Sequence, residues 1–429
     1  MTSGGLTCDD ELIRSIQFVE KEYPMDYEKR NRHLTAELQR VRGALAHLAT
    51  RDEDAVRRHP VSSDDTGSLF GPNVLDQDRW IIPFVSPWER DLIVLDESKM
   101  ARRLGNKSQV ITLPPNSHIR TRQDHCISSA AVAIRMGRIL GLNVPLLNTG
   151  MRYHDGGHEP GGHHGEDFTN ERKGWDGVNH PKFRHNVMGV ILAQHIERGG
   201  RGLGLTWQVL DIFHRHSSGV GRALIDSSMS EETALSVKSD KIDYTFADIN
   251  DILKREPLAS QGFTAKRYVH ILEAADWFGR NQRERVFTCI ANLCVESAEK
   301  GHVSFDECEA AVRFEALKGM MYRDIYLAID RRSLHLKMEI VYEMLEKALV
   351  DVDPALVFAM LDDIELELLA GMYDRHESIT ERTLNRISVG EVLKHLRGKM
   401  IDLTDPDLNW GIAPEAADPE PDTGSVVTG

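Results

Sequence analysis

The sequence predicts an all-α protein with at most a small β-hairpin, and three observations support that fold class. Apolar residues recur at i, i+3 and i+4 over long stretches, which is the spacing of amphipathic helices. Runs of alternating or β-branched residues, which would indicate strands, are scarce. The chain has 429 residues with 41% hydrophobic and 28% charged residues, a composition typical of a globular protein with a sizeable core.

Residues 1 to 78 are expected to form a helical N-terminal appendage and a linker. Residues 9 to 58 carry many charges with apolar residues at helical spacing, and Pro24 divides them into two predicted helices. Residues 59 to 74 are rich in Ser, Gly, Asp and Pro without periodicity, which is typical of a linker. The N-terminus lacks the charged and apolar regions of a secretory signal, so we expect a cytoplasmic protein.

Residues 79 to 404 are expected to form the core domain with its C-terminal helices. The spacing of apolar residues predicts helices within residues 130 to 142, 206 to 216, 240 to 255, 309 to 329 and 336 to 349. Residues 110 to 115, VITLPP, form the best strand signal and predict a small hairpin. Residues 405 to 429 are rich in Pro, Asp and Gly and are predicted to be a disordered tail.

Charge and cysteine content narrow the classes of function. A net charge of −15 repels nucleic acid, so a nucleotide must be met by a local cationic pocket or a metal, and single-strand binding is expected to be at most a local property. No apolar run reaches the roughly 20 residues that cross a bilayer, so no membrane association is expected. The five cysteines are interpreted as reduced thiols: Cys8, Cys126, Cys289, Cys294 and Cys308.

The stretch YHDGGHEPGGHHGE, residues 153 to 166, concentrates imidazole and carboxylate groups between glycines. His154 and Asp155 are adjacent, His125 lies upstream at the start of a predicted helix, and Asp240 begins another. Two His and two Asp suit a borderline or hard divalent ion and leave positions open for water and substrate oxygens. This composition is typical of a catalytic metal site, and it suits Mn, Mg, Fe or Co.

Several motifs in one order carry a resemblance to a known family. They are HIRTRQDH, RYHDGGHEPGGHHGE, FRHN, GLGLTWQVLDIFHRHSSG, SDKIDYTFADINDI and AGMYDR, within about Trp88 to Arg375. The chain resembles the HD-domain deoxynucleoside triphosphate triphosphohydrolases, the bacterial dGTPase-like group related to the vertebrate SAM-and-HD-domain dNTPase. The resemblance implies an HD-domain helical fold and metal-dependent hydrolysis of dGTP or other dNTPs to deoxynucleoside and tripolyphosphate. It also implies a homo-oligomer, a tetramer or hexamer, and allows for a nucleotide activator.

The resemblance implies that the metal ligands are His125, His154, Asp155 and Asp240. Asp276 competes as the fourth ligand, but Asp240, Tyr244 and Asp248 are spaced on one helix face, and this cluster matches the ligand helix of the family. We therefore interpret Asp276 as structural. The family usually has Leu, Pro and Phe where this chain has Gly156, Glu159 and Gly161.

Four further residues are candidates for the chemistry at the phosphate. The departing 5′-oxygen needs a proton, and His163 is our candidate general acid, with Glu166 three residues away to orient and charge it. The catalytic pair of the family falls on these two residues. His158 and His185 are expected to line the same pocket, whereas His164 is interpreted as a bystander.

Six residues are candidates for binding the substrate. Arg122 and Lys241 are placed by the sequence near the ion. The resemblance implies that Tyr244, Asp248 and Gln109 contact the sugar. Arg323 is expected either to bind the distal phosphates or to form an ion pair on the helix surface. His214 and His216 match a family segment whose role the sequence does not give, and core packing is the assigned role for both.

Two other classes of protein compete with this interpretation. Another HD-domain phosphohydrolase, a 5′-nucleotidase or a phosphodiesterase, would share the metal ligands but is expected to lack SDKIDYTFAD and AGMYDR. A non-catalytic, nucleotide-sensing oligomer is expected to have lost a ligand, and none is lost here.

Overall fold

The computed structural model describes residues 85–112, 117–217, 228–399 and 401–404. Over these ranges the chain is helical, and the β pairing consists of one antiparallel bridge between Ser108 and Thr121. The predicted all-α fold is therefore confirmed. Of the hairpin predicted at residues 110–115, residues 113–115 lie outside the described residues, and residues 110–112 form no strand. The predicted N-terminal appendage and C-terminal tail lie outside the described residues.

In the first half of the described chain there are eight α-helices and one π-helical turn, and α5 and α7 pack against the long helix α6. These elements are α4 (Pro87–Asp96), α5 (Lys99–Leu104), α6 (Arg122–Leu140), α7 (Val144–Tyr153), α8 (His163–Lys173), α9 (His185–Ile191), η3 (Leu192–Ile196), α10 (Glu197–Gly200) and α11 (Trp207–Arg215).

The second half begins with α12, which packs along α6, and ends in a group of shorter helices. They are α12 (Glu231–Asp248), η4 (Ile249–Lys254), η5 (Ala259–Gln261), α13 (Val269–Asp276), α14 (Gln282–Lys300), α15 (Glu309–Met320), η6 (Met321–Ile325), η7 (Tyr326–Ala328), α16 (Arg332–Ala348), α17 (Pro354–Ala359), α18 (Asp363–Asp374), α19 (Glu381–Leu384) and α20 (Gly390–Leu396). All five helical segments expected from apolar spacing lie in these elements.

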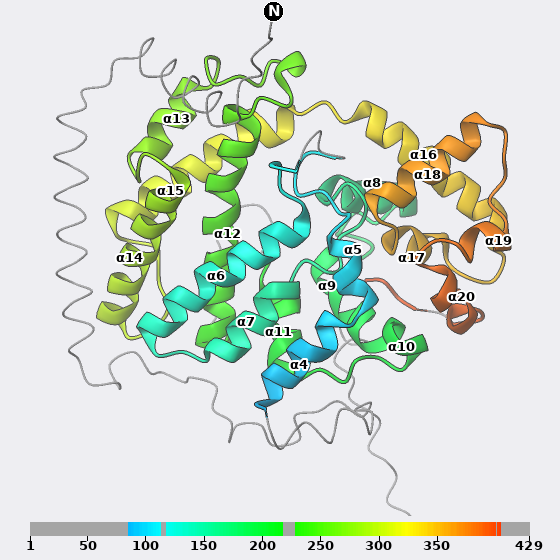
Figure 1. Cartoon of the computed structure of the whole chain (residues 1–429), viewed down its shortest axis with the longest axis horizontal. Helices are drawn as coiled ribbons and strands as arrows, with labels where there is room; N and C mark the ends of the chain where they lie inside the picture. Colours follow the sequence, from blue (N-terminus) through cyan, green and yellow to red (C-terminus); the bar gives the residue numbers. More distant parts are fainter. Residues whose placement is uncertain (1–84, 113–116, 218–227, 400, 405–429) are drawn as a thin grey trace, which may run out of the picture.

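The packing centre of the molecule is the α6, α7 and α12 group (Figure 1). Helix α6 packs against α7 and α12, α11 packs against α7 and α9, and α14 packs against α6 and α12. Helices α16, α17 and α18 gather on the other side of the molecule, where α16 packs against α8. Segments far apart in the sequence therefore meet where α7 ends and α8 begins.

Local sequence signals fix the ends of the central helices. Thr121 caps α6, because its side chain accepts from the Asp124 N–H and Asp124 accepts from the Thr121 N–H. Gly141 ends α6 in the left-handed region with φ 72°. Ser230 caps α12 by accepting from the N–H of Thr233. The ends of α6 and α12 thus follow from capping residues, while their burial follows from packing.

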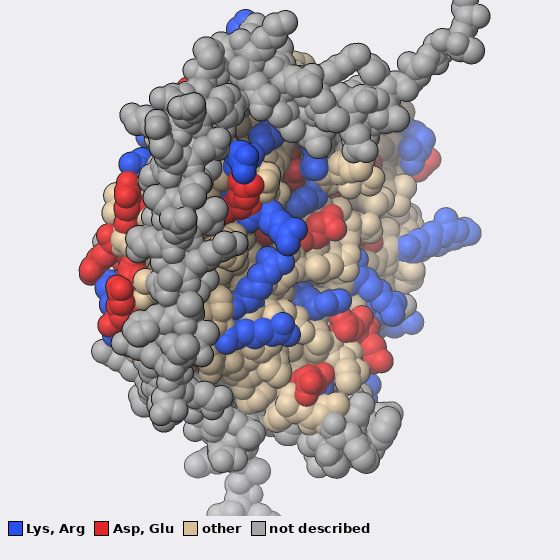
Figure 2. All heavy atoms as spheres, turned by 60° about the vertical axis from the view of Figure 1, so that its left-hand side comes forward, with Lys and Arg blue, Asp and Glu red and all other residues tan. Residues whose placement is uncertain are grey.

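Lys and Arg side chains gather in the middle of one face of the molecule, although the chain as a whole carries a charge of −15 (Figure 2). The charge is therefore unevenly distributed over the surface. Among the described cysteines, Cys126, Cys289, Cys294 and Cys308 are all free thiols, as predicted. No helix in the described part of the chain is long and apolar enough to cross a membrane.

Candidate metal centre and catalytic site

The structure brings the four predicted metal ligands together at the packing centre. His125 lies in the first turn of α6, His154 is the C-cap residue of α7 with Asp155 next to it, and Asp240 lies in the middle of α12. His125 Nε2 is 2.9 Å from Asp240 Oδ1 and 3.7 Å from Asp155 Oδ2. His154 Nε2 is 3.4 Å from Asp155 Oδ1 and 3.5 Å from Asp240 Oδ1.

Hydrogen bonds behind the two imidazoles turn their Nε2 atoms toward the carboxylates. His154 Nδ1 lies 2.7 Å from the Met151 carbonyl oxygen, so Nδ1 carries the proton, and His125 Nδ1 lies 2.9 Å from Asp243 Oδ2. A carbonyl or carboxylate behind the ring is the usual support of a metal-binding histidine. The buried His154 Nε2 has no hydrogen-bond partner among the described residues. These residues fit a divalent metal ion.

The protonation states of the candidate metal ligands depend on the hydrogen bonds and ion pairs that they form with neighbouring side chains. Although burial disfavours the imidazolium form, hydrogen bonds to Asp240 and Asp243 raise the pKa of His125 to about 9. Burial also opposes ionisation of Asp155, but the surrounding His154, His158 and Arg122 hold its pKa well below the usual range. Because a metal displaces the protons of its histidine ligands, binding is expected to release protons and to weaken at low pH.

The competing ligand Asp276 is bound elsewhere. Its Oδ1 accepts from Arg285 Nη2 at 2.6 Å, and the Arg285 side chain is fully buried. Asp276 therefore has the structural role that the sequence interpretation gave it, and Asp240 lies with the other candidate ligands.

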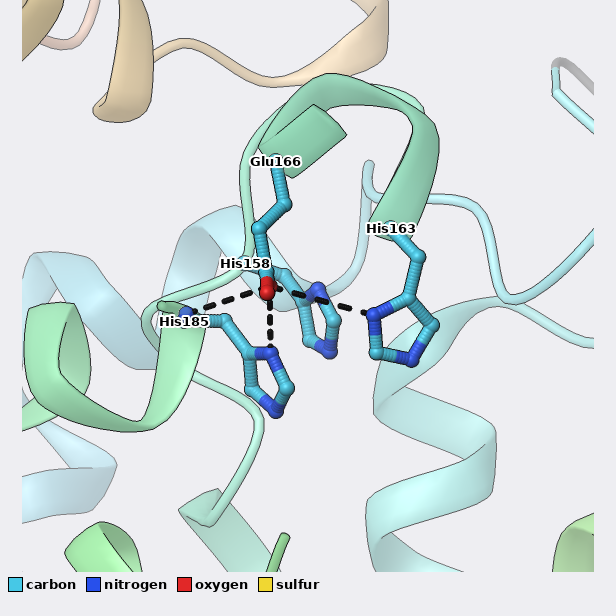
Figure 3. A group of neighbouring side chains, drawn as sticks. All are labelled: His158, His163, Glu166 and His185. Atoms are coloured by element: carbon cyan, nitrogen blue, oxygen red, sulfur yellow. Dashed lines mark hydrogen bonds and ion pairs between the residues drawn. The ribbon is translucent and has the colours of Figure 1, made fainter. Parts of the chain in front are cut away.

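A second cluster of three histidines and one carboxylate lies beside the first, and the carboxylate of Glu166 points into the middle of it (Figure 3). Glu166 Oε2 is 2.7 Å from His185 Nδ1 and 3.8 Å from His163 Nδ1. The rings of His158 and His185 are stacked, with centroids 3.7 Å apart and planes inclined by 9°. The side chain of His163 is 71% exposed, which leaves it accessible to a substrate.

The sequence pairs Glu166 with His163, whereas the structure gives it a shorter contact with His185. His185 is the first residue of α9, and Glu166 lies on α8. Their contact therefore depends on how the tertiary fold brings these two helices together. Although neighbouring groups partly desolvate the ring and so disfavour its charged form, the Glu166 carboxylate raises the pKa of His163. The Glu166 carboxylate therefore contacts two imidazoles, those of His185 and His163, whereas the sequence paired it with His163 alone.

Comparison with known proteins identifies the family of this chain. Residues 122–251 match the HD domain family. A deoxyguanosinetriphosphate triphosphohydrolase-like protein of Caldanaerobacter subterraneus is 30% identical over 258 residues, which are 60% of this chain and 69% of the relative. The protein of the same name in Clostridium tetani is 30% identical over 269 residues, 62% of this chain and 71% of the relative.

The chain belongs to the deoxyguanosinetriphosphate triphosphohydrolase-like family of HD-domain proteins. The Pelagibacter ubique member is 35% identical over 185 residues, which are 39% of this chain and 49% of the relative. Membership of this family, together with the His and Asp clusters, indicates a metal-dependent phosphohydrolase.

Of the residues predicted to bind the substrate, some lie near the candidate metal ligands and others lie away from them. Arg122 is buried and donates from Nη1 to Asp155 Oδ2 at 2.6 Å and from Nη2 to the Gln109 carbonyl oxygen at 3.1 Å. The side-chain Oε1 of Gln109 is buried and has no partner among the described residues. Both residues therefore lie beside the metal ligands, and Gln109 has an acceptor atom available to a ligand.

Helix α12 places the predicted sugar-binding residues after Asp240. The ring of Tyr244 lies 6.4 Å from that of His125. Asp248 is buried, and its two oxygens accept from Arg120 Nη2 at 3.2 Å and from the Tyr326 hydroxyl at 2.8 Å. Burial lowers the pKa of Lys241 to about 8.

Arg323 pairs with the adjacent residue on the surface. Its Nε is 2.9 Å from Asp324 Oδ1, and its side chain is 68% exposed. The structure therefore favours the surface ion pair over a contact with distal phosphates. Arg331 donates from Nη1 to the Tyr326 carbonyl oxygen at 2.9 Å. Burial and the nearby charge of Arg331 lower the pKa of His164 to about 4.

Three more residues near the metal ligands were not identified from the sequence. Asp243 supports His125, and its position three residues after Asp240 on the same helix is a signal that could have identified it. Arg120 binds Asp243 at 2.7 Å and Asp248 at 3.2 Å. His216, assigned to core packing, has its Nε2 3.5 Å from Asp155 Oδ1.

The loop at Gly161 and Gly162, just before α8, is held by helix α18 from the C-terminal part of the domain. Asp363 is fully buried, and its carboxylate accepts from the N–H of Gly161 at 2.6 Å and from the N–H of Ser108 at 2.7 Å. Gly161 and Gly162 have φ of 74° and 62°, which favour glycine, and a Cβ at Gly162 would approach Arg122 Nη2 to 2.7 Å. The glycines thus let the loop pass close to Arg122.

Proposed function

We propose that this protein hydrolyses deoxynucleoside triphosphates to deoxynucleoside and tripolyphosphate. The observation that carries the proposal is the buried convergence of His125, His154, Asp155 and Asp240 beside the exposed His163. The four candidate ligands suit a divalent metal, and His163 offers a proton at the surface of the same site. The names of the relatives in Caldanaerobacter and Clostridium support the choice of a triphosphate substrate.

The proposed reaction is attack of water at the α-phosphorus with departure of the nucleoside 5′-oxygen. A divalent ion held by the four ligands would polarise phosphoryl oxygens and orient the attacking water. The bond between the α-phosphorus and the 5′-oxygen breaks as the bond to the water oxygen forms. Tripolyphosphate keeps all three phosphoryl groups, and the 5′-oxygen leaves as an alcohol once it has received a proton.

His163 is proposed to supply that proton. Its side chain is exposed, and the negative charge of Glu166, with Oε2 3.8 Å from His163 Nδ1, favours its protonated form. The buried rings of His158 and His185 lie 4.8 and 5.2 Å from the His163 ring, so they are placed to line the same pocket. A positioned proton donor of this kind contributes about 10²–10⁴-fold to a rate.

Binding of the triphosphate is proposed to use groups around the two clusters. Arg122 and Lys241 would offset the negative charge, and the free Oε1 of Gln109 would accept from the sugar. Tyr244 would pack against the deoxyribose. Asp248 already accepts from Arg120 and Tyr326, so a 3′-hydroxyl would be its third donor.

The test is to incubate the purified protein with each of the four dNTPs, singly and mixed, together with Mn²⁺ or Mg²⁺, and to separate the products by anion-exchange chromatography. Deoxynucleoside with intact tripolyphosphate is the expected result. Activity that requires the mixture would support activation by a nucleotide. The Asp155→Ala variant, purified in parallel, controls for contaminating phosphatases.

Two outcomes would contradict the proposal. Release of monophosphate with pyrophosphate, or of orthophosphate alone, would indicate a different HD-domain phosphohydrolase, such as a 5′-nucleotidase or a phosphodiesterase. No turnover with any dNTP or metal would favour a nucleotide-sensing protein without catalytic activity.

A further inference from the structure

Arg120 contacts three carboxylates with one guanidinium group. It lies directly before Thr121, the N-cap residue of α6, and 14% of its side chain is exposed. Its Nη1 donates to Asp243 Oδ2 at 2.7 Å, and its Nη2 donates to Asp248 Oδ1 at 3.2 Å. Its Nε lies 3.4 Å from Asp251 Oδ2. Arg120 therefore joins the start of α6 to α12 and to η4, the π-helical turn that follows α12.

The charges around Arg120 argue against a direct contact with phosphate. Its positive charge faces three negative groups, and its Nη1 also donates to Ser128 Oγ at 3.3 Å. An excess of negative charge repels a triphosphate. The contribution of Arg120 to the site therefore comes through the carboxylates that it orients.

Asp243 is the fixed end of this arrangement. It is buried, and its Oδ2 accepts from Ser128 Oγ at 2.7 Å as well as from Arg120. The same oxygen lies 2.9 Å from Nδ1 of the candidate metal ligand His125. Because Ser128 and His125 both lie in α6, these contacts tie Asp243 to the helix that carries this ligand. Arg120 is thus anchored beside the candidate metal centre.

Asp248 is the end that can receive a substrate. It is buried, its Oδ1 accepts from Arg120, and its Oδ2 accepts from the Tyr326 hydroxyl at 2.8 Å. An ionised carboxylate can accept about four hydrogen bonds, so Asp248 has room for another donor. Under the proposed function that donor is the 3′-hydroxyl of the deoxyribose. Because a hydrogen bond weakens steeply when its angle changes, the orientation of Asp248 decides whether this bond forms.

We propose that Arg120 is a positioning residue that holds Asp248 in place relative to the candidate metal centre, so that the site selects nucleotides with a 3′-hydroxyl. The guanidinium suits this role because its donors are fixed in one plane, whereas an ammonium group is a point charge on a flexible stem. The inference rests on the proposed function for the contact between Asp248 and the sugar. It goes beyond that function by assigning the selectivity to a residue outside the set proposed to bind the substrate.

The experiment compares the binding of dGTP and of 2′,3′-dideoxyGTP, which lacks the 3′-hydroxyl, by isothermal titration calorimetry with Mn²⁺. The parent protein is the full-length chain with His163→Ala, so that nucleotide is consumed slowly. It is expected to bind dGTP about 10- to 100-fold more tightly, because a hydrogen bond to a charged group contributes that much. Arg120→Gln is expected to reduce this ratio to below about 3-fold, because dGTP binds more weakly while the dideoxynucleotide binds as before.

Arg255→Gln is the matched control. Arg255 pairs with Asp251, so this substitution removes one positive charge from the same group of carboxylates and leaves the contact of Arg120 with Asp248 in place. The ratio is expected to stay at the value of the parent protein. Arg120→Lys is the second variant, which retains the charge without the planar fork, and it is expected to lower the ratio by at least about threefold. Arg120→Lys decides the outcome if circular dichroism shows that Arg120→Gln does not fold.

An unchanged ratio in a folded Arg120 variant, an equal loss of affinity for both nucleotides, or an equal fall in the Arg255→Gln control would overturn the inference. A parent protein that binds the two nucleotides equally, or binds neither, would also overturn it. In that case the proposed function still stands if the protein with His163 intact hydrolyses dGTP. Selectivity that depends on Arg120, without hydrolysis of any dNTP by the protein with His163 intact, would refute the function and support the inference.

Discussion

Asp155 and His163 lie eight positions apart in the sequence, but substitutions at the two positions are expected to impair metal binding and activity differently. Asp155 is buried among the metal ligands, so Asp155→Ala is expected to lose both metal and activity. His163 is exposed and is proposed to protonate the leaving group, so His163→Ala is expected to lower kcat by about 10²–10⁴-fold while the metal stays bound. Metal analysis beside kcat on both purified variants checks this.

His164→Ala is the control for that comparison, because His164 is adjacent to His163 but its ring lies against His335, with centroids 5.5 Å apart. It is expected to keep its metal and its kcat. The assignment of roles is wrong if His163→Ala loses its metal or if Asp155→Ala stays active.

The contact of Glu166 with His163 predicts a pH dependence. A general acid works in its protonated form, so kcat is expected to fall as the pH rises through the pKa of His163. Glu166 raises that pKa, while the facing His158 and His185 contribute no carboxylate. Glu166→Gln is therefore expected to move this fall in kcat to lower pH, as measured by kcat against pH.

Glu171→Gln provides the matched control for the pH profile, since Glu171 lies on the same helix α8 but is exposed. Its profile is expected to superimpose on that of the wild type. A Glu166→Gln profile that falls at the same pH as the wild type would show that another group supplies the proton.

At the scale of the elements, the sequence predicts helices well and their contacts poorly. Apolar spacing and the capping residues Thr121 and Ser230 are local signals, and the predicted helices are present. The contacts of Arg120 with Asp243 and Asp248 join residues more than a hundred positions apart, and no spacing rule gives such a pair. The metal-ligand candidates could be named only because several motifs occurred together.

Helix α18 is predicted to support the loop at Gly161 and Gly162, which precedes His163 and is called the catalytic loop below. Asp363→Ala would leave the buried N–H of Ser108 and the half-buried N–H of Gly161 without their acceptor, at a cost of up to about 1–3 kcal/mol for each group. We expect a lower free energy of unfolding and, because the loop precedes His163, a lower kcat in the folded variant. Urea denaturation and kcat measurements test both effects.

Asp374→Ala serves as the control for α18, because Asp374 is exposed at the other end of the same helix. Its free energy of unfolding is expected to change by less than about 0.5 kcal/mol. If Asp363→Ala and Asp374→Ala have the same stability and kcat, the carboxylate of Asp363 does not hold the loop.

At the scale of the whole molecule, the candidate metal ligands lie on or beside three helices of the packing centre, α6, α7 and α12. A metal that binds only the folded chain stabilises it, by about 2.7 kcal/mol when free metal is about 100 times Kd. Chelation is therefore expected to lower the melting temperature, and added Mn²⁺ is expected to restore it. The melting temperature of Asp155→Ala should not respond to metal, and an equal response in both proteins would contradict the site.

The bond from Asp363 to Gly161 spans 202 residues and has a consequence for synthesis. A ribosome makes His125, His154, Asp155 and Asp240 well before it makes Asp363. A nascent chain could thus bind metal before its catalytic loop has its anchor, and full activity is expected only after α18 has emerged. The Gly161 loop is therefore expected to reach its final position late in synthesis, after the segments that carry the candidate metal ligands have been made.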